Sequence, residues 1–169
     1  TCQTLLIHVP HLQNAVNEMV RVLRPGGLFL VAEPNNFGSK AAGLIADPLL
    51  PWTEVSGLLE LEYRCTRGKL AVGEGHQSAG HLVLAALRAC SWSDVHVRLN
   101  NQSARVAPPY SDLGSKTIIE FMRTSYDSGA AMALGGTKEN SRRYFLAGGG
   151  DESRFLELWE CARAELARQ

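Results

Sequence analysis

The chain has 169 residues, of which 45% are hydrophobic and 20% charged, values ordinary for one folded domain and unlike those of a disordered chain. Lys and Arg (17) balance Asp and Glu (17), and no basic run interleaves with aromatic residues. No apolar stretch approaches the ~20 residues of a bilayer span. We therefore expect neither a nucleic-acid partner nor membrane association.

The first 36 residues predict the crossover unit of a parallel sheet. A short apolar segment ending near His8 is followed by a helix with its apolar residues at helical spacing, then by Pro25-Gly26-Gly27 and the apolar run Leu28–Ala32. A strand that is apolar on both faces belongs in the middle of such a sheet. Since the chain opens inside this unit, we expect further chain upstream. Ligands bind at the carboxyl ends of parallel strands, marked here by Gln3–His8 and Glu33–Asn36.

The next segment, 37–67, is predicted to be helical but interrupted by Pro48 and Pro51. Its longer part, Thr53–Arg67, has an apolar face. Because the segment separates two α/β units, we interpret it as a helical cap over the ligand crevice.

The second half predicts a loop over Gly68–Gly80, a helix over His81–Cys90 and an alternating edge strand over Val95–Leu99. Beyond a connector, the pattern predicts helices and one irregular stretch: a helix over Asp112–Tyr126, irregular structure from Gly135 to Gly150, and a last helix over Asp151–Arg168 with Asp151 as its N-cap.

Two strings in the chain resemble class I S-adenosylmethionine-dependent methyltransferases. The first begins Cys2-Gln3-Thr4-Leu5-Leu6-Ile7-His8-Val9, continues through Arg21-Val22-Leu23-Arg24-Pro25-Gly26-Gly27, and ends in a strand before Glu33-Pro34; the second is Ala89-Cys90-Ser91-Trp92-Ser93-Asp94-Val95. In that family the first string is the fourth strand, a helix, a turn and the fifth strand, and the second leads into the sixth strand. The resemblance implies one α/β domain over 1–169, a partial Rossmann-like methyltransferase fold made of strands four to six with flanking helices.

The same resemblance implies roles for particular residues. Cys2, Gln3, Thr4 and His8 match positions beside the cofactor, S-adenosylmethionine. His8 and Glu33 are the catalytic candidates, and Asn35 and Asn36 match the edge that faces the acceptor, by default a small organic molecule. A structural role is equally open for two of these residues: His8 could pack on the first helix, and Glu33 could cap a loop amide.

The family's first strand and its glycine-rich loop have no counterpart before Thr1. We therefore expect this chain alone to bind S-adenosylmethionine weakly or not at all.

Two other functions remain open. Gly73, Gly75 and Gly80 mimic the glycine loop of a nucleotide-binding oxidoreductase, although the third glycine of G-x-G-x-x-G would fall at Ser78. Alternatively, an unpaired strand edge would let the chain act as a non-catalytic module that forms a homodimer.

Four cysteines, Cys2, Cys65, Cys90 and Cys161, lie far apart without a C-x-x-C pair. The four histidines His11, His76, His81 and His96 have no ligand-like spacing with each other. We expect reduced cysteines, a cytoplasmic location and no metal site.

Overall fold

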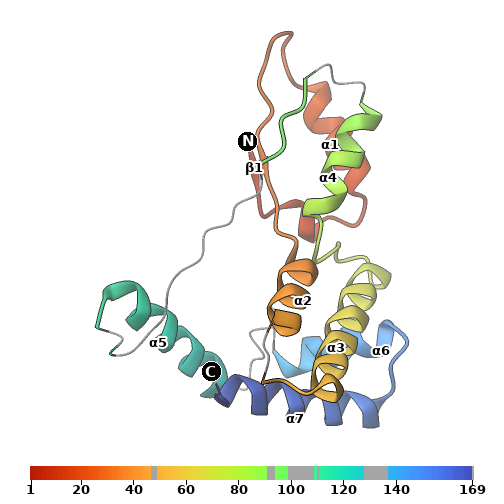
Figure 1. Cartoon of the computed structure of the whole chain (residues 1–169). Coiled ribbons are helices and arrows are strands. Elements are labelled where there is room, and N and C mark those ends of the chain that lie inside the picture. The colour runs from red at the N-terminus through yellow and green to blue at the C-terminus, as the bar shows by residue number, and fades with distance from the viewer. Residues whose placement is uncertain (47–48, 91–93, 99–108, 110, 128–136, 169) are drawn as a thin grey trace.

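The computed structural model of the chain describes residues 1–46, 49–90, 94–98, 109, 111–127 and 137–168 (Figure 1). Over these residues the chain forms seven α-helices, a 3-10 turn and one pair of short strands. None of the helices within those ranges is long and apolar enough to cross a membrane.

The predicted α/β fold with strands four to six of a Rossmann-like sheet is wrong. The described residues form one two-stranded parallel sheet, β1 (Cys2–Gln3) beside β2 (Val31–Ala32), and the rest of their regular structure is helical. Residues 94–98, which cover most of the predicted edge strand, are not in a strand, and Leu99 lies outside the described residues. A strand exists only where a neighbour takes up its backbone hydrogen bonds, and apolar alternation alone cannot supply that neighbour.

The predicted parallel pairing is nevertheless confirmed. Cys2 lies opposite Val31 and Gln3 opposite Ala32, and the Cys2 amide donates to Leu30 O at 2.8 Å. The connecting helix, α1 (Leu12–Arg21), forms where the 3.6-residue apolar period predicts it. The chain then turns at Gly26, whose φ of 74° suits glycine best.

One face of β2 and its approach packs into a hydrophobic core, and the other face does not. Phe29 and Val31 pack against a cluster contributed by β1, the 3-10 turn η1 (Leu6–His8), α1 and α4 (Gly80–Ala89). The buried members of this first core are Cys2, Leu6, Ile7, Val16, Ala79, Val83 and Ala86. By contrast, Leu28 and Leu30 are 84% and 58% exposed. The expectation that Leu28–Ala32 is buried on both faces is therefore wrong.

The remaining helices build a second core. It lies among α3 (Trp52–Ala71), α6 (Lys138–Ala147) and α7 (Glu152–Arg168), with α2 (Asn36–Ala46) beside α3 and α5 (Leu113–Asp127) extending to one side (Figure 1). The aromatic rings of Phe145, Phe155 and Trp159 pack in series at tilted angles, with centroids 5.7 and 5.6 Å apart. The buried members of this second core are Leu58, Leu61, Cys65, Phe145, Phe155, Leu158, Trp159 and Ala162.

Two predicted boundaries need correction. Helix α3 continues through Gly68, where a loop was expected to begin. A Cβ at that position would lie 1.6 Å from Tyr144 O, so the missing side chain lets α3 and α6 approach backbone to backbone. The stretch expected to be irregular contains α6, whose N-cap Thr137 accepts a hydrogen bond from Asn140 N. A cap side chain stabilises a helix start, and burial of Phe145 holds the helix in place.

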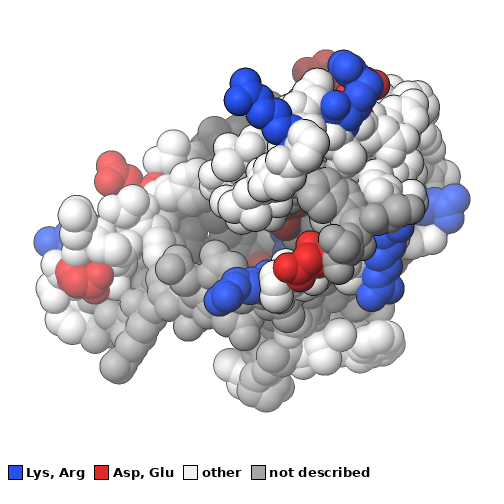
Figure 2. All heavy atoms as spheres, turned by 90° about the horizontal axis from the view of Figure 1, so that it is seen from above, with Lys and Arg blue, Asp and Glu red and all other residues white. Residues whose placement is uncertain are grey.

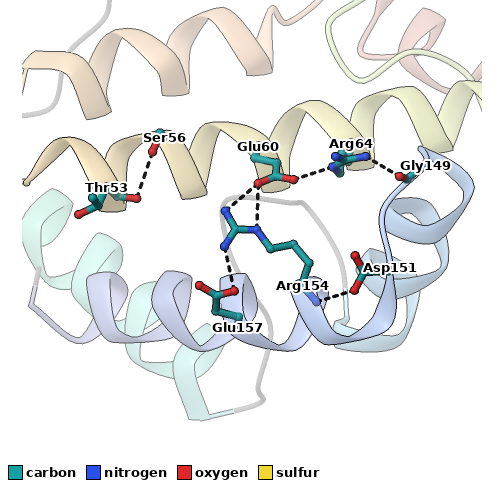
Figure 3. Close-up of polar contacts among 8 residues, drawn as sticks. All are labelled: Thr53, Ser56, Glu60, Arg64, Gly149, Asp151, Arg154 and Glu157. Carbon is teal, nitrogen blue, oxygen red and sulfur yellow. Dashed lines mark hydrogen bonds and ion pairs between the residues drawn. The ribbon is translucent and has the colours of Figure 1, made fainter.

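The start of α7 is held by the predicted cap and by a network of charged side chains (Figure 3). Asp151 Oδ1 accepts from Arg154 N at 2.9 Å, which confirms the predicted N-cap. The Arg154 guanidinium reaches Glu60 on α3 and Glu157 on α7, both at 2.8 Å. Arg64, one turn along α3, donates to Gly149 O. The helices of the second core are therefore tied together at their surface as well as through apolar packing.

Charges are distributed without a large patch of one sign on the face in Figure 2. Among the described residues seen there, Lys and Arg side chains are separated from one another and interspersed with Asp and Glu. Positive and negative side chains are thus intermixed on this face, in keeping with their equal numbers in the sequence.

Candidate functional site

A strained turn follows β1 at its carboxyl end. Thr4 has a φ of 51°, and no other described non-glycine residue has a positive φ. A β-branched residue in this region costs about 1–2 kcal/mol. Such strain persists only where surrounding contacts impose it, and it concentrates at functional sites. Here the Thr4 amide is held by Ala32 O at 2.9 Å, while the chain turns into η1.

The carboxylate of Glu33 caps this turn from the neighbouring strand. Its Oε1 accepts hydrogen bonds from the amides of Leu5 and Leu6, at 2.8 and 3.0 Å. Successive backbone amides in a turn form a small anion-binding concavity, and the Glu33 carboxylate fills it. Its other oxygen, Oε2, is buried without a hydrogen-bond partner among the described residues. The geometry matches the structural alternative for Glu33, a cap on loop amides.

Cys2 is the buried neighbour of this carboxylate. The residue is 6% exposed, and its thiol donates to Glu33 Oε1 at 3.3 Å. Burial, followed by the hydrogen bond and charge of Glu33, raises the pKa of the Cys2 thiol. A thiol with a raised pKa is poorly nucleophilic, and its contacts lie inside the protein.

The other residues expected beside the cofactor are exposed. Gln3 ends β1, Thr4 makes the turn and His8 ends η1, all with exposed side chains. Because Glu33 binds the first amides of the turn that His8 ends, the structure brings these two residues to the same short segment. Three of the four residues expected to face the cofactor can therefore offer polar groups at this edge.

Asn35 and Asn36 lie at the start of α2. Asn35 Oδ1 accepts from Gly38 N at 3.3 Å, which is the contact of an N-cap residue, and Asn36 is the first residue of the helix. Asn35 is exposed and Asn36 half-buried, so both lie near the edge after β2 while one of them also caps a helix.

The glycine loop forms the junction between the two cores. Gly75 lies so close to η1 that a Cβ would sit 2.4 Å from Ile7 O, and a Cβ on Gly80 would sit 2.5 Å from Glu33 O. Gly80 N donates to Pro34 O at 3.0 Å, and Ser78 Oγ accepts from Phe37 N. These glycines serve close backbone packing.

This loop lacks the context of a dinucleotide-binding motif. Leu70 and Ala71 belong to the end of α3, so a helix stands where the fingerprint requires a strand. The geometry gives the oxidoreductase alternative no support.

Lys69 is a residue that the sequence analysis missed. It is 7% exposed, and its ammonium donates to Ile7 O and to Gln77 Oε1, each at 3.0 Å. It lies with other buried polar side chains along a small cleft lined by Glu62, Cys65, Thr66, Lys69, Gln77 and Tyr144. The sequence does indicate that Lys69 is buried, because it lies four residues after Cys65 and so continues the buried face of α3.

Burial controls ionisation in this cleft. Desolvation raises the pKa of Glu62 despite its ion pair with Lys40 at 3.0 Å, and raises the pKa of Cys65 to about 12. Desolvation lowers the pKa of Lys69, against the attraction of Glu74. The described residues contain no group of three or more His, Cys, Asp or Glu side chains placed to hold a metal ion.

Comparison with known proteins adds no relative: the chain matches no protein-family model, no curated protein and no solved structure.

Proposed function

We propose that the chain serves in S-adenosylmethionine-dependent methyl transfer to a small organic acceptor, at the carboxyl end of β1. The observation that carries this proposal is the strained turn at Thr4, which follows a parallel strand and leads to the exposed side chain of His8. Ligands of parallel sheets bind at such strand ends. The identity of the reaction comes from the sequence resemblance, which covers this same segment.

The proposed role of each residue follows from whether its polar group is exposed or already hydrogen-bonded within the protein. The cofactor, when bound, supplies a methyl group on a positively charged sulfur, which the acceptor's nucleophile takes as its own proton leaves. His8 is the candidate to receive that proton, because its imidazole is exposed at the edge. Gln3 and Thr4 have exposed polar groups that can orient the cofactor. Glu33 positions the turn, since its Oε1 already accepts from backbone amides.

Titration of the labelled chain with S-adenosylmethionine, followed by NMR, tests this proposal because it detects millimolar binding as well as tight binding. Since the proposal requires at least the weak binding expected of this chain, millimolar S-adenosylmethionine should shift the amide signals of Gln3, Thr4 and His8, and NAD should leave them in place. No change at these amides, or shifts confined to residues 73–80 with NAD, would overturn the proposal.

We also propose a cytoplasmic location. The support is that no disulfide joins the four cysteines, all of which are among the described residues. Thiols of this kind persist in reducing compartments.

A non-catalytic, dimer-forming function is the second candidate, favoured by the uncovered apolar face at Leu28 and Leu30. An exposed strand with apolar side chains invites pairing with another chain. Light scattering should then show a dimer. Leu30→Lys should make it monomeric, whereas Leu5→Lys, at another exposed leucine, should leave the dimer intact. A monomer at high protein concentration would exclude this function without bearing on methyl transfer.

A further inference from the structure

The turn that ends in His8 is held at both ends by charged side chains from different parts of the chain. Glu33, after β2, binds the amides of Leu5 and Leu6 at its start, and Lys69, on α3, binds the Ile7 carbonyl near its end. A carboxylate at the amide end and an ammonium at the carbonyl end both match the dipole of a helical turn. The two contacts therefore stabilise one backbone conformation.

Lys69 links the position of helix α3 to that of the turn η1. Its Nζ is fixed by two acceptors, Ile7 O and Gln77 Oε1, and the side chain leaves α3 at a buried point. Gly75 packs directly against the same backbone, from Ile7 O to Val9 N, with no space for a Cβ. A movement of α3 relative to the first core would therefore displace the backbone at Ile7, the residue before His8.

A buried ammonium is a costly way to fill this space. A methionine of similar length would avoid the desolvation of a charge, which is unfavourable in a protein interior. The ammonium offers what methionine does not, namely donors for the Ile7 carbonyl and the Gln77 amide oxygen.

We propose that Lys69 is a positioning residue for His8, which fixes the turn η1 to helix α3. The proposal rests on the proposed function only in that His8 is taken to face the acceptor. The positioning itself is a property of the chain without ligand and is tested without one.

The test compares Lys69→Met and Lys69→Arg with the matched control Lys40→Met. Lys40 pairs with Glu62, which lines the same cleft, but no hydrogen bond or ion pair among the described residues joins Lys40 to the turn. In Lys69→Met we expect the His8 imidazole signals to move. Amide exchange at His8 and Val9 should accelerate about tenfold to a hundredfold, which is the effect expected from the loss of one charge-assisted hydrogen bond. Lys69→Arg should restore most of the protection, and Lys40→Met should leave both readouts unchanged.

A folded Lys69→Met variant with unchanged His8 signals would overturn the proposal, as would an equal effect in Lys40→Met. Should Lys69→Met not fold, Gln77→Ala removes the second acceptor of Lys69, and faster exchange at His8 is again the expected result. Unchanged exchange at His8 in the Gln77→Ala variant would overturn the proposal. Failure of S-adenosylmethionine to shift the wild-type signals would instead remove the proposed function and leave this inference standing.

Discussion

Replacing Glu33 by alanine should destabilise the fold because the carboxylate accepts hydrogen bonds from two backbone amides of the turn. Glu33 Oε1 accepts from Leu5 N at 2.8 Å and Leu6 N at 3.0 Å, and Leu6 is fully buried. Hydrogen bonds to a charged group contribute about 1.5–3 kcal/mol each. Since Leu5 is exposed and water can reach its amide, we expect Glu33→Ala to lower the free energy of unfolding by roughly 2–4 kcal/mol.

Glu33→Gln separates the acceptor oxygen from the charge. The glutamine carbonyl can still accept from both amides, and hydrogen bonds to a neutral acceptor are about half as strong as charge-assisted ones. We therefore expect this variant to lose about half as much stability as Glu33→Ala. Urea unfolding at neutral pH measures both values, and amide exchange at Leu5 and Leu6 reports the local effect.

The control is Glu18→Ala, which removes a carboxylate of an exposed ion pair with Arg21. Such pairs contribute at most about 1 kcal/mol. The reasoning is refuted if Glu33→Ala matches this control, or if Glu33→Gln costs as much as Glu33→Ala. The first result would mean that solvent satisfies the turn amides, and the second that the acceptor oxygen is irrelevant.

Three further predictions concern the helical core. Hydrogen bonds from Arg154 above all lower the pKa of Glu60, so its stabilisation is present above the ordinary pKa of 4.5 and lost as the pH falls below it. Glu60→Gln should weaken this acid sensitivity in unfolding measurements at several pH values. Burial raises the pKa of Glu62, so the wild type should lose stability as the pH rises above 4.5. Glu62→Gln should therefore gain stability relative to the wild type over that range, and a constant difference would contradict this. Gly68→Ala should cost at least about 3 kcal/mol in chemical unfolding, because its Cβ meets an immovable backbone carbonyl. In Gly57→Ala the Cβ meets only the end of a leucine side chain, so equal costs in the two variants would disprove the reasoning.

Local sequence patterns correctly predicted the elements whose hydrogen bonds and caps are formed within one segment of the chain. The apolar stripe gave α1, and the last helix with its Asp151 cap lies where expected, because caps and helical hydrogen bonds are local. The parallel pairing of Cys2 and Gln3 with β2 was also predicted, from the order of apolar segments.

The failures lie where a second segment decides the outcome. Whether Leu28–Ala32 is covered on both faces depends on neighbours that its own sequence does not specify. Gly68 was expected to begin a loop, but here it is the point where two helix backbones approach each other closely. The same holds for Lys69, whose partner on the turn, the Ile7 carbonyl, is 62 residues away in sequence.

At the candidate site, the polar residues divide into those that hold the backbone and those that remain available. Glu33 and Lys69 use their charges on backbone groups of the turn, and Cys2 uses its thiol on Glu33. Gln3 and His8 keep exposed polar groups on the same segment. Because the holding residues carry the charges, their loss should show first in stability and amide exchange. Loss of the His8 imidazole should leave stability intact and affect only what the site binds or transforms. Apart from Lys69, the sequence alone places these residues at the ends of the two strands, but only their hydrogen bonds separate the two roles.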